Sequence, residues 1–484
     1  MEKRRSGVLM PVSALPSNHG IGDFGKTAYE FVDLLKEGGF RIWQILPLNP
    51  LGYGNSPYQP YSSKAMDDLY ISLDILYEEG LIKKAPAYNK YSSKIEYDEL
   101  RAYKQHFLRL AFKKFVKDEE YEKFVKFDWV YNYAVFLTFK KSNRLNCWND
   151  WPKFMKNWII DKKLDLSLYS NDIDFEMFVQ FILYKQWIKL KKYANDKGIE
   201  IMGDMPIYVG IDSDDVWANQ KLFLLDSKGK PTFIAGVPPD YFSETGQRWG
   251  NPLYNWPKLK KSGFKFWIDR LDYNSKLFDI IRIDHFRAFD TYWKIPASCD
   301  TAIEGRWVKA PGYAFFDKVF EELPSINIVA EDLGDLRKEV LELRDHYNFK
   351  GMRIVQFSFD PTGMLKDNEN LIIYTGTHDN QTIRGWYSKQ NKKFKLQTEE
   401  FFKENNLNYG NIGLNMVGYT LSSNAEIAIV PLMDILNLTD KSRLNTPGTV
   451  GNPNWQYRLT RFTGFKKLTP KLKEMNIRFQ RVKK

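Results

Sequence analysis

The chain has 484 residues, of which 43% are hydrophobic and 27% charged, and its formal net charge is +11. This length and apolar fraction fit a soluble globular protein, and they exclude a disordered chain and a fibrous repeat. No run of about 18 apolar residues occurs, which excludes a transmembrane helix. The basic residues are scattered along the chain, so a lysine-rich surface explains the charge better than nucleic-acid or membrane binding.

The start of the chain and its two cysteines both predict a cytoplasmic protein. Residues 1–16 place basic residues before an apolar stretch, but this stretch is short, contains Pro11 and lacks a small-residue cleavage pattern. We therefore expect a first strand here and no signal peptide. Cys147 and Cys299 form neither a disulfide framework nor a zinc site, and reduced thiols fit the cytosol.

Short apolar runs recur along the chain, and several of them end in a polar or acidic residue. Between most runs lie segments with apolar residues at helical spacing, such as residues 26–37, which Gly38 and Gly39 end, 264–279 and 335–344. Strands that alternate with helices indicate a parallel sheet, and eight of them predict an α/β fold of the (β/α)8 barrel type. The predicted strands are residues 7–15, 40–48, 199–209, 280–285, 326–333, 352–359, 371–379 and 425–432.

Two gaps between predicted strands are too long for simple connections. Residues 60–195, between the second and third strands, carry Tyr, Phe, Lys and Glu at helical spacing and predict an inserted, mainly helical subdomain. Residues 210–262 follow the third strand and contain many Gly, Pro and Trp residues. A long irregular loop after a barrel strand lies on the catalytic face and often forms a lid, a role we assign to residues 230–260. The whole chain, 1–484, is then a single catalytic barrel with two additions.

Three acidic residues stand at the ends of the fourth, fifth and seventh predicted strands. They are Asp284 in RIDHFR, Glu331 in AEDLG and Asp379 in THDN. The carboxyl ends of barrel strands meet at one mouth, so we expect these carboxylates to converge. Like charges repel in a partly desolvated site, which makes such a cluster unfavourable unless a function requires it. Each acid by itself could still be a helix cap or a solvated residue, and Asp284 could simply pair with Arg282 or Arg287.

Glycosyl transfer is a reaction that requires such carboxyl groups. One carboxylate attacks the anomeric carbon, and a protonated carboxyl group delivers a proton to the leaving oxygen. Arg282 lies two residues before Asp284 and shares its face of the strand, where the guanidinium would keep Asp284 ionised. Nearby anions should raise the pKa of Glu331, which suits a general acid. His378 and Asn380 offer donors for sugar hydroxyls, and no motif requires a metal or another cofactor.

Several longer segments resemble glycoside hydrolase family 77, the 4-α-glucanotransferases or amylomaltases, over nearly the whole chain. The stretch GVPPDYFS followed by GQRWGNP, within residues 236–252, is the most specific, whereas RID and HD alone indicate only the wider α-amylase clan. The other segments that carry the resemblance are RSGVL, GIGD, WQILPL, SPY, GDMPIY, RIDHFR, AEDLG and THDN.

The resemblance implies a role for each matching residue. Asp284 resembles the nucleophile that forms a β-glucosyl-enzyme, Glu331 the acid/base, and Asp379 the residue that stabilises the transition state on the donor glucose. The substrate-binding residues that it implies are Arg282 and His378 at that subsite, Tyr58 stacked on the donor sugar with Ser56 nearby, Asp212 as a donor-side hydroxyl ligand, and Asp240 and Trp249 on a lid that covers the acceptor and excludes water.

Two segments depart from the family pattern. After SPY the chain reads KAMDD at residues 64–68, where the family often continues toward GNP, so this loop can differ in shape. Near the end, GNPNWQYR at residues 451–458 has an altered spacing. Either Asn452 or Asn454 then fits the family's sugar ligand, and Asn454 is our candidate. Neither departure touches the three acids.

The sequence therefore predicts a retaining enzyme that transfers α-1,4-glucan segments between maltooligosaccharides or starch-type glucans, which act as donor and acceptor. An α-amylase-like hydrolase is the nearest alternative, because the two reactions differ only in whether water reaches the intermediate. A glucan-binding barrel without activity is a second alternative, which the intact set of three acids disfavours. The segment at residues 230–260, together with the resemblance, favours transfer.

Overall fold

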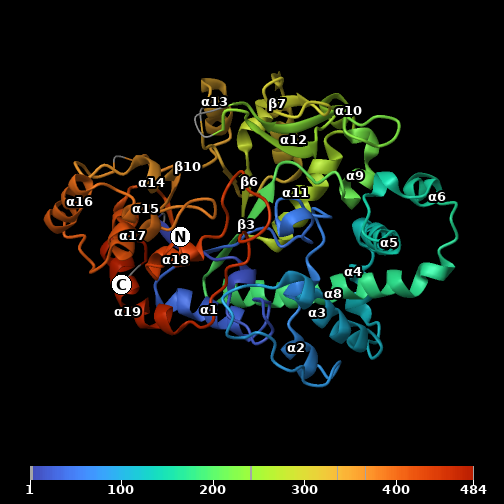
Figure 1. Ribbon diagram of the computed structural model, residues 1–484, viewed down its shortest axis with the longest axis horizontal. Helices are drawn as coiled ribbons and strands as arrows, with labels where there is room; N and C mark the ends of the chain where they lie inside the picture. Colours follow the sequence, from blue (N-terminus) through green and yellow to red (C-terminus); the bar gives the residue numbers. More distant parts are fainter. Residues whose placement is uncertain (1–3, 240–242, 335, 366, 483–484) are drawn as a thin grey trace.

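The core of the protein is a sheet of eight parallel strands in the order β10-β11-β12-β1-β2-β3-β6-β9. The computed structural model describes residues 4–239, 243–334, 336–365 and 367–482, and Figure 1 shows helices packed around this sheet. Contacts between β9 and β10 close the sheet, because the Ala330 N–H donates to the Lys350 carbonyl oxygen at 3.0 Å. Within the described ranges, the barrel strands are β1 Arg5–Leu9, β2 Ile42–Gln44, β3 Glu200–Pro206, β6 Ile280–Asp284, β9 Ile328–Ala330, β10 Gly351–Ile354, β11 Leu371–Tyr374 and β12 Ile427–Pro431.

Each of the eight predicted apolar runs overlaps one barrel strand, which confirms the predicted (β/α)8 barrel. Most runs are longer than their strands, because apolar residues continue into buried segments beyond the strand. The run at 352–359 is an example, since its second half forms the short helix α14 (Val355–Ser358). The predicted helix at 26–37 is α1 (Lys26–Glu37), which buries Phe31 and ends at Gly38. Phe31 packs against Phe465 of the C-terminal helix α19 (Thr463–Arg478).

Helices fill the long segment between β2 and β3, on the right and lower side of Figure 1. None of the helices in the described ranges has the length and apolar character needed to span a membrane. The division of the chain into a barrel and a subdomain at residues 60–195 stays a prediction. The helices not yet named are α2 Leu73–Glu78, α3 Tyr97–Phe112, α4 Glu119–Phe124, α5 Asp128–Ser142, α6 Lys153–Lys156, α7 Trp158–Asp161, α8 Ser170–Asp196, α9 Asp214–Ala218, α10 Trp256–Lys261, α11 Lys265–Leu277, α12 Gly312–Glu322, α13 Lys338–His346, α15 Ile383–Ser388, α16 Lys392–Glu404, α17 Ile412–Ser422 and α18 Leu432–Ile435.

A second, antiparallel sheet with the strand order β5-β4-β7-β8 accompanies the barrel. Its strands are β4 (Phe233–Val237), β5 (Gln247–Pro252), β7 (Thr291–Pro296) and β8 (Arg306–Lys309). The first two come from the segment predicted as an irregular loop, so this segment is more regular than its Gly and Pro content suggested. The reason is local burial, because Ile234 and Ile295 pack together in a small apolar cluster of their own. The role of residues 230–260 as a lid stays a prediction.

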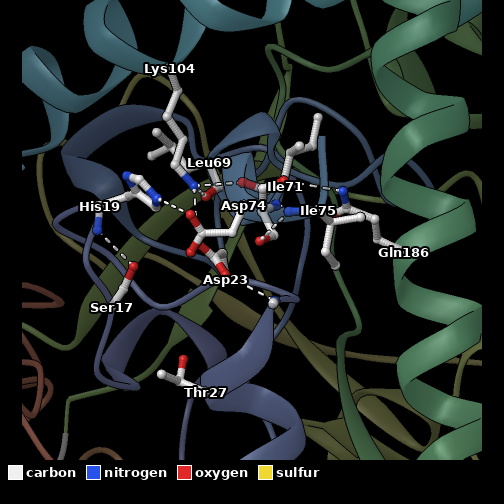
Figure 2. A network of polar contacts seen from close by, with 12 residues as sticks. Ser17, His19, Asp23, Thr27, Leu69, Ile71, Asp74, Ile75, Lys104 and Gln186 are labelled. Atoms are coloured by element: carbon white, nitrogen blue, oxygen red, sulfur yellow. Dashed lines mark hydrogen bonds and ion pairs between the residues drawn. The ribbon is translucent and has the colours of Figure 1, made fainter. Parts of the chain in front are cut away.

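A buried lysine fastens α3 to the barrel, as Figure 2 shows. The Lys104 side chain is 0% exposed; its ammonium group donates to the carbonyl oxygens of Leu69 and Ile71 and lies 3.7 Å from Asp23 Oδ2. Asp23, in the loop between β1 and α1, also accepts a hydrogen bond from the Gly25 N–H at 2.9 Å. This network joins the inserted helices to the first βα connection of the barrel.

We predict that Lys104→Met destabilises the protein strongly. The change keeps most of the side-chain volume but leaves Asp23 as an uncompensated buried carboxylate and two carbonyl oxygens unpaired, which corresponds to about 3–5 kcal/mol of unfolding free energy. Urea unfolding measures the effect, and Lys123→Met, on the exposed ion pair with Glu119, is the control that should show no measurable change. A Lys104→Met protein as stable as the wild type would contradict the assignment.

Candidate active site

The three predicted acids lie at the same end of the barrel. Asp284 is the last residue of β6, Glu331 directly follows β9, and Asp379 lies in the loop after β11. β6 and β9 are hydrogen-bonded neighbours, with Ile283 in register with Ala330. Asp284 and Glu331 are therefore neighbouring residues at the carboxyl ends of two adjacent strands. The parallel direction of the strands brings carboxyl groups from distant parts of the sequence to one mouth.

A buried arginine lies between two carboxylates at this mouth. Arg282 Nη1 is 2.6 Å from Asp204 Oδ1 and 3.0 Å from Asp284 Oδ1, and only 4% of Arg282 is exposed. Asp204 reaches the arginine from β3, because the sheet register places these two residues opposite each other. Burial lowers the pKa of Arg282, but the two carboxylates more than offset this, and the pKa lies well above its ordinary value. The guanidinium is therefore a permanent cation in the site.

Aromatic rings line the mouth beside this ion pair. The Tyr58 O–H donates to Asp204 Oδ2 at 2.7 Å, and the Tyr58 ring stacks on His378 with centroids 5.1 Å apart. Trp455 contacts both rings, at 5.8 and 5.9 Å between centroids. Burial, together with the Asp204 carboxylate, raises the pKa of Tyr58 well above its ordinary value, which keeps the hydroxyl proton on Tyr58. The structure thus brings Tyr58 and His378 together, and their contacts with a donor sugar stay a prediction.

Glu331 is held by two backbone donors and keeps a proton near neutral pH. Its Oε2 accepts a hydrogen bond from the His285 N–H at 2.7 Å, and Oε1 accepts one from the Leu333 N–H at 3.0 Å. His285 makes its contact from a left-handed backbone conformation, with φ of 54°, which is uncommon for a residue with a side chain. The pKa of Glu331 is raised to about 7, chiefly by burial and also by the Asp284 carboxylate, while Arg282 and the two backbone hydrogen bonds oppose the rise.

Asp284 differs from Glu331 in its direct contact with a cation. Burial raises the pKa of Asp284 as well, and Arg282, 3.0 Å away, opposes the rise. Because the guanidinium contacts Asp284 and stabilises its ionised form, and because the pKa of Glu331 is raised to about 7, Glu331 is the better proton carrier of the two. One ionised and one protonated carboxyl group on adjacent strands is the arrangement that supplies a nucleophile and an acid.

Asp379 lies at a more open position of the same mouth. Its side chain is 43% exposed, and its Oδ1 lies 3.5 Å from His378 Nε2. The same oxygen accepts a hydrogen bond from Asn445 Nδ2 at 2.7 Å. The accessible carboxylate can therefore contact a ligand that enters the mouth.

Two of the remaining predicted residues lie close to this centre. Trp249, on β5, packs its ring edge-on against His285 with centroids 4.9 Å apart, so the predicted lid segment reaches the residue after Asp284. Ser56 Oγ accepts a hydrogen bond from the Tyr58 N–H at 3.3 Å and helps to shape the Tyr58 loop. Asp240 lies outside the described residues.

Two other predicted residues are engaged elsewhere. Asp212 forms an ion pair with the buried Lys140 of α5. The Asn454 amide accepts a hydrogen bond from the Thr446 N–H at 3.0 Å and donates one to Thr449 Oγ1 at 2.9 Å. Asn454 therefore stabilises its own loop. The sugar contacts of Asn454 and Asp212 stay predictions.

Known proteins resemble this chain over nearly its whole length. The sequence model of the 4-alpha-glucanotransferase family, glycoside hydrolase family 77, matches residues 10–463. The chain belongs to this family. A 4-alpha-glucanotransferase of Streptococcus pneumoniae serotype 4 is 42% identical over 494 residues, which cover 98% of this chain and 96% of that protein. One from Aquifex aeolicus is 41% identical over 469 residues, or 94% and 95% of the two chains. The amylomaltase from Streptococcus agalactiae, solved in complex with acarbose, has a TM-score of 0.92 at 37% identity and covers 99% of this chain and 100% of that one.

Family 77 membership confirms the resemblance read from the motifs, yet sequence reasoning missed three residues of the site. Asp204 lies within the GDMPIY motif, and its position on a barrel strand next to that of Arg282 was a usable signal. Asn445 and Trp455 lie in the loop after β12, far from the acids in sequence. The GNPNWQYR segment, predicted to supply a sugar ligand, was a usable signal for Trp455, whereas no signal indicated the contact of Asn445 with Asp379.

We predict that Asp284→Asn lowers the pKa of Glu331 below about 7, because the variant removes the negative charge that raises this pKa while burial remains. Infrared difference spectroscopy of the carboxyl band during a pH titration measures the shift. Asp379→Asn, which removes the same charge at the more open position, should change the Glu331 pKa less. A Glu331 pKa that is the same in the wild type and in Asp284→Asn would contradict this coupling.

Proposed function

We propose that the protein is a retaining 4-α-glucanotransferase. It cleaves an α-1,4 bond of a maltooligosaccharide or a starch-type glucan and transfers the released segment to the 4-hydroxyl group of another glucan. The observation that carries the proposal is the pairing of Asp284, which contacts Arg282, with Glu331, whose pKa is about 7, on adjacent strands. Membership of family 77 supports the same reaction.

In the first half of the reaction, a carboxylate oxygen of Asp284 attacks the anomeric carbon of the donor glucose while the glycosidic C–O bond breaks. Glu331 gives its proton to the departing oxygen, so the leaving glucan carries away a neutral 4-hydroxyl group. The glucosyl unit is now an ester of Asp284 with inverted configuration, and Glu331 is ionised. Before the attack, Arg282 keeps Asp284 in the ionised, nucleophilic form.

In the second half, the 4-hydroxyl group of an acceptor glucan enters on the side that the leaving group vacated. Ionised Glu331 removes the hydroxyl proton while the acceptor oxygen attacks the anomeric carbon. The ester bond breaks, the electron pair returns to Asp284, and Glu331 is protonated again. Two inversions at one carbon retain the α configuration.

We assign the residues around this pair to the two sides of the bond that is cleaved. Asp379 and His378 would bind hydroxyl groups of the donor glucose, and Asp379 would favour the positive charge that develops in the oxocarbenium-like transition state. Tyr58 would stack on that sugar. The candidates for more peripheral donor contacts are Ser56, Asp212 and Asn454, and those for the acceptor side are Asp240 and Trp249.

Transfer in place of hydrolysis requires that a glucan reaches the ester before water does. Trp249, which contacts His285 beside Asp284, supports a covered acceptor side, because an aromatic side chain there displaces water and offers a face for a sugar ring.

We also propose a cytoplasmic location, since Cys147 and Cys299 are free thiols, as expected in a reducing compartment. We propose no nucleic-acid partner.

We predict that the purified protein converts maltotriose into glucose and a ladder of longer oligosaccharides while the total number of reducing ends stays constant. Transfer exchanges one reducing end for another, whereas hydrolysis creates a new one at every cleavage. Chromatography of the products, together with a reducing-sugar assay, measures both quantities. Asp284→Ala should lower the rate by about 1,000-fold or more because the nucleophile is lost. Rising reducing ends with only short products would identify a hydrolase, and binding of the sugar without any turnover would identify a binding protein.

We predict that kcat/KM for maltotriose falls as the pH rises through about 7. The sign follows from the role of Glu331, whose raised pKa keeps the acid protonated below about pH 7, whereas above this pH the proton needed by the leaving group is lost. A pH–rate profile of the wild type measures the alkaline limb. An activity that stays constant up to pH 9 would contradict Glu331 as the acid.

A further inference from the structure

The loop that carries His378 and Asp379 is held by a single stretch of chain, residues 434–445, that follows β12. Asp434 accepts hydrogen bonds from Thr375 Oγ1 at 2.7 Å and from the Ile383 N–H at 2.8 Å. Thr375 and Ile383 are the two ends of this loop. A little further along, Asp440 accepts a hydrogen bond from the Thr382 N–H at 3.1 Å. These contacts fix where the loop begins and where it ends.

The same stretch then contacts the middle of the loop. The Arg443 guanidinium donates to the backbone carbonyl oxygen of Asp379 at 2.6 Å, and the Asn445 N–H donates to that of His378 at 3.1 Å. The Asn445 side chain reaches further, because its Nδ2 donates to Asp379 Oδ1 at 2.7 Å. Arg443 also donates to the Asn445 carbonyl oxygen at 2.6 Å, which fixes the donor itself.

We propose that Asn445 is a positioning residue for the transition-state carboxylate of Asp379, an inference that rests on the proposed function. Asn445 and His378 both approach Oδ1, at 2.7 and 3.5 Å. Within the described residues, no hydrogen bond to Oδ2 of Asp379 is present, so Oδ2 is the oxygen available to the donor sugar. Asn445 therefore determines which oxygen binds substrate and at what angle.

The chemistry of the amide suits this task. The Asp379 side chain is 43% exposed, and a carboxylate half in water can rotate about its last bond unless a hydrogen bond holds it. A lysine or arginine at position 445 would hold it too, but its charge would compete with the positive charge that develops on the sugar. The neutral amide fixes the carboxylate and leaves its negative charge available to the transition state.

The first test removes the donor. Asn445→Ala should lower kcat for maltotriose disproportionation by about 10- to 100-fold, because a small error in the placement of a catalytic group has an effect of that order, while KM changes less than kcat. Thr449→Ala is the matched control. Thr449 is exposed in the same loop and bonds to Asn454, so its loss perturbs the loop without touching Asp379, and kcat should stay within about twofold of the wild type. Thermal unfolding of each variant checks the fold.

The second test keeps the size of the side chain and changes its charge. Asn445→Asp places a second carboxyl group against Asp379, where the two groups share a proton at low pH. Among the residues that the structure describes, the other charged and titratable groups that face Asp379 are His378, Arg443, Asp284 and Tyr58, and these stay the same. The acid limb of the pH–rate profile should therefore move to higher pH, whereas an unchanged profile would mean that the side chain at position 445 does not contact Asp379 during turnover.

These outcomes separate the inference from the proposed function. If Asp379→Ala is inactive while Asn445→Ala keeps the wild-type kcat and Asn445→Asp keeps the wild-type pH profile, Asn445 has no positioning role and the inference is wrong. If Asp379→Ala itself retains full activity, the role proposed for Asp379 fails and the inference fails with it. If Asn445→Ala does not fold, the pH profile of Asn445→Asp decides by itself.

Discussion

The buried guanidinium of Arg282 is the interaction on which the rest of the site depends. It lies against the carboxylates of Asp204 and Asp284 with almost no exposure to water. Without this cation, carboxyl groups at one mouth would repel each other and take up protons. Arg282 favours the ionised form of Asp284, which it contacts directly, while burial and the Asp284 carboxylate raise the pKa of Glu331 to about 7. Asp204, held by the same guanidinium, accepts a hydrogen bond from the Tyr58 O–H. The arginine and the burial of Glu331 together make the two carboxyl groups on neighbouring strands different.

The barrel supplies the geometry that this electrostatic arrangement requires. In the register of the adjacent strands β3, β6 and β9, Asp204 lies opposite Arg282, and Ala330, the residue before Glu331, lies opposite Ile283. The loops after the strands add the groups that we propose to contact a sugar, and chain segments outside the barrel sheet hold these loops in place. Residues 434–445 hold the Asp379 loop, and Trp455 packs against Tyr58 and His378. The strand ends hold the carboxyl groups that we propose to react, and the loops hold the groups that we propose to bind the sugar.

The sequence was sufficient to predict the repeated strands and the helices, because each of these elements is formed by residues that are close together along the chain. Eight apolar runs predicted the barrel, and residues 26–37 predicted α1 with its observed bounds. Strands β4 and β5 escaped notice because their Gly and Pro residues are typical of loops, while β4, to which β5 pairs, also pairs with β7, where Ile234 lies opposite Ile295 far along the chain. Asn445 escaped notice for the same reason, since its partner lies 66 residues earlier. The amide of Asn454, predicted to bind sugar, is engaged by Thr446 and Thr449, which only three-dimensional contacts could reveal.

Direct identification of the glucosyl-enzyme tests whether Asp284 is the nucleophile. The Glu331→Gln variant is incubated with an α-maltosyl fluoride, whose fluoride leaves without a proton, so the first half-reaction proceeds while the second lacks its base. Peptide mass spectrometry then locates the sugar. We predict one maltosyl group in ester linkage to Asp284. A label on Asp379 or another residue, or fluoride release with no labelled peptide in the acid-quenched protein, would contradict the assignment of Asp284 as the nucleophile.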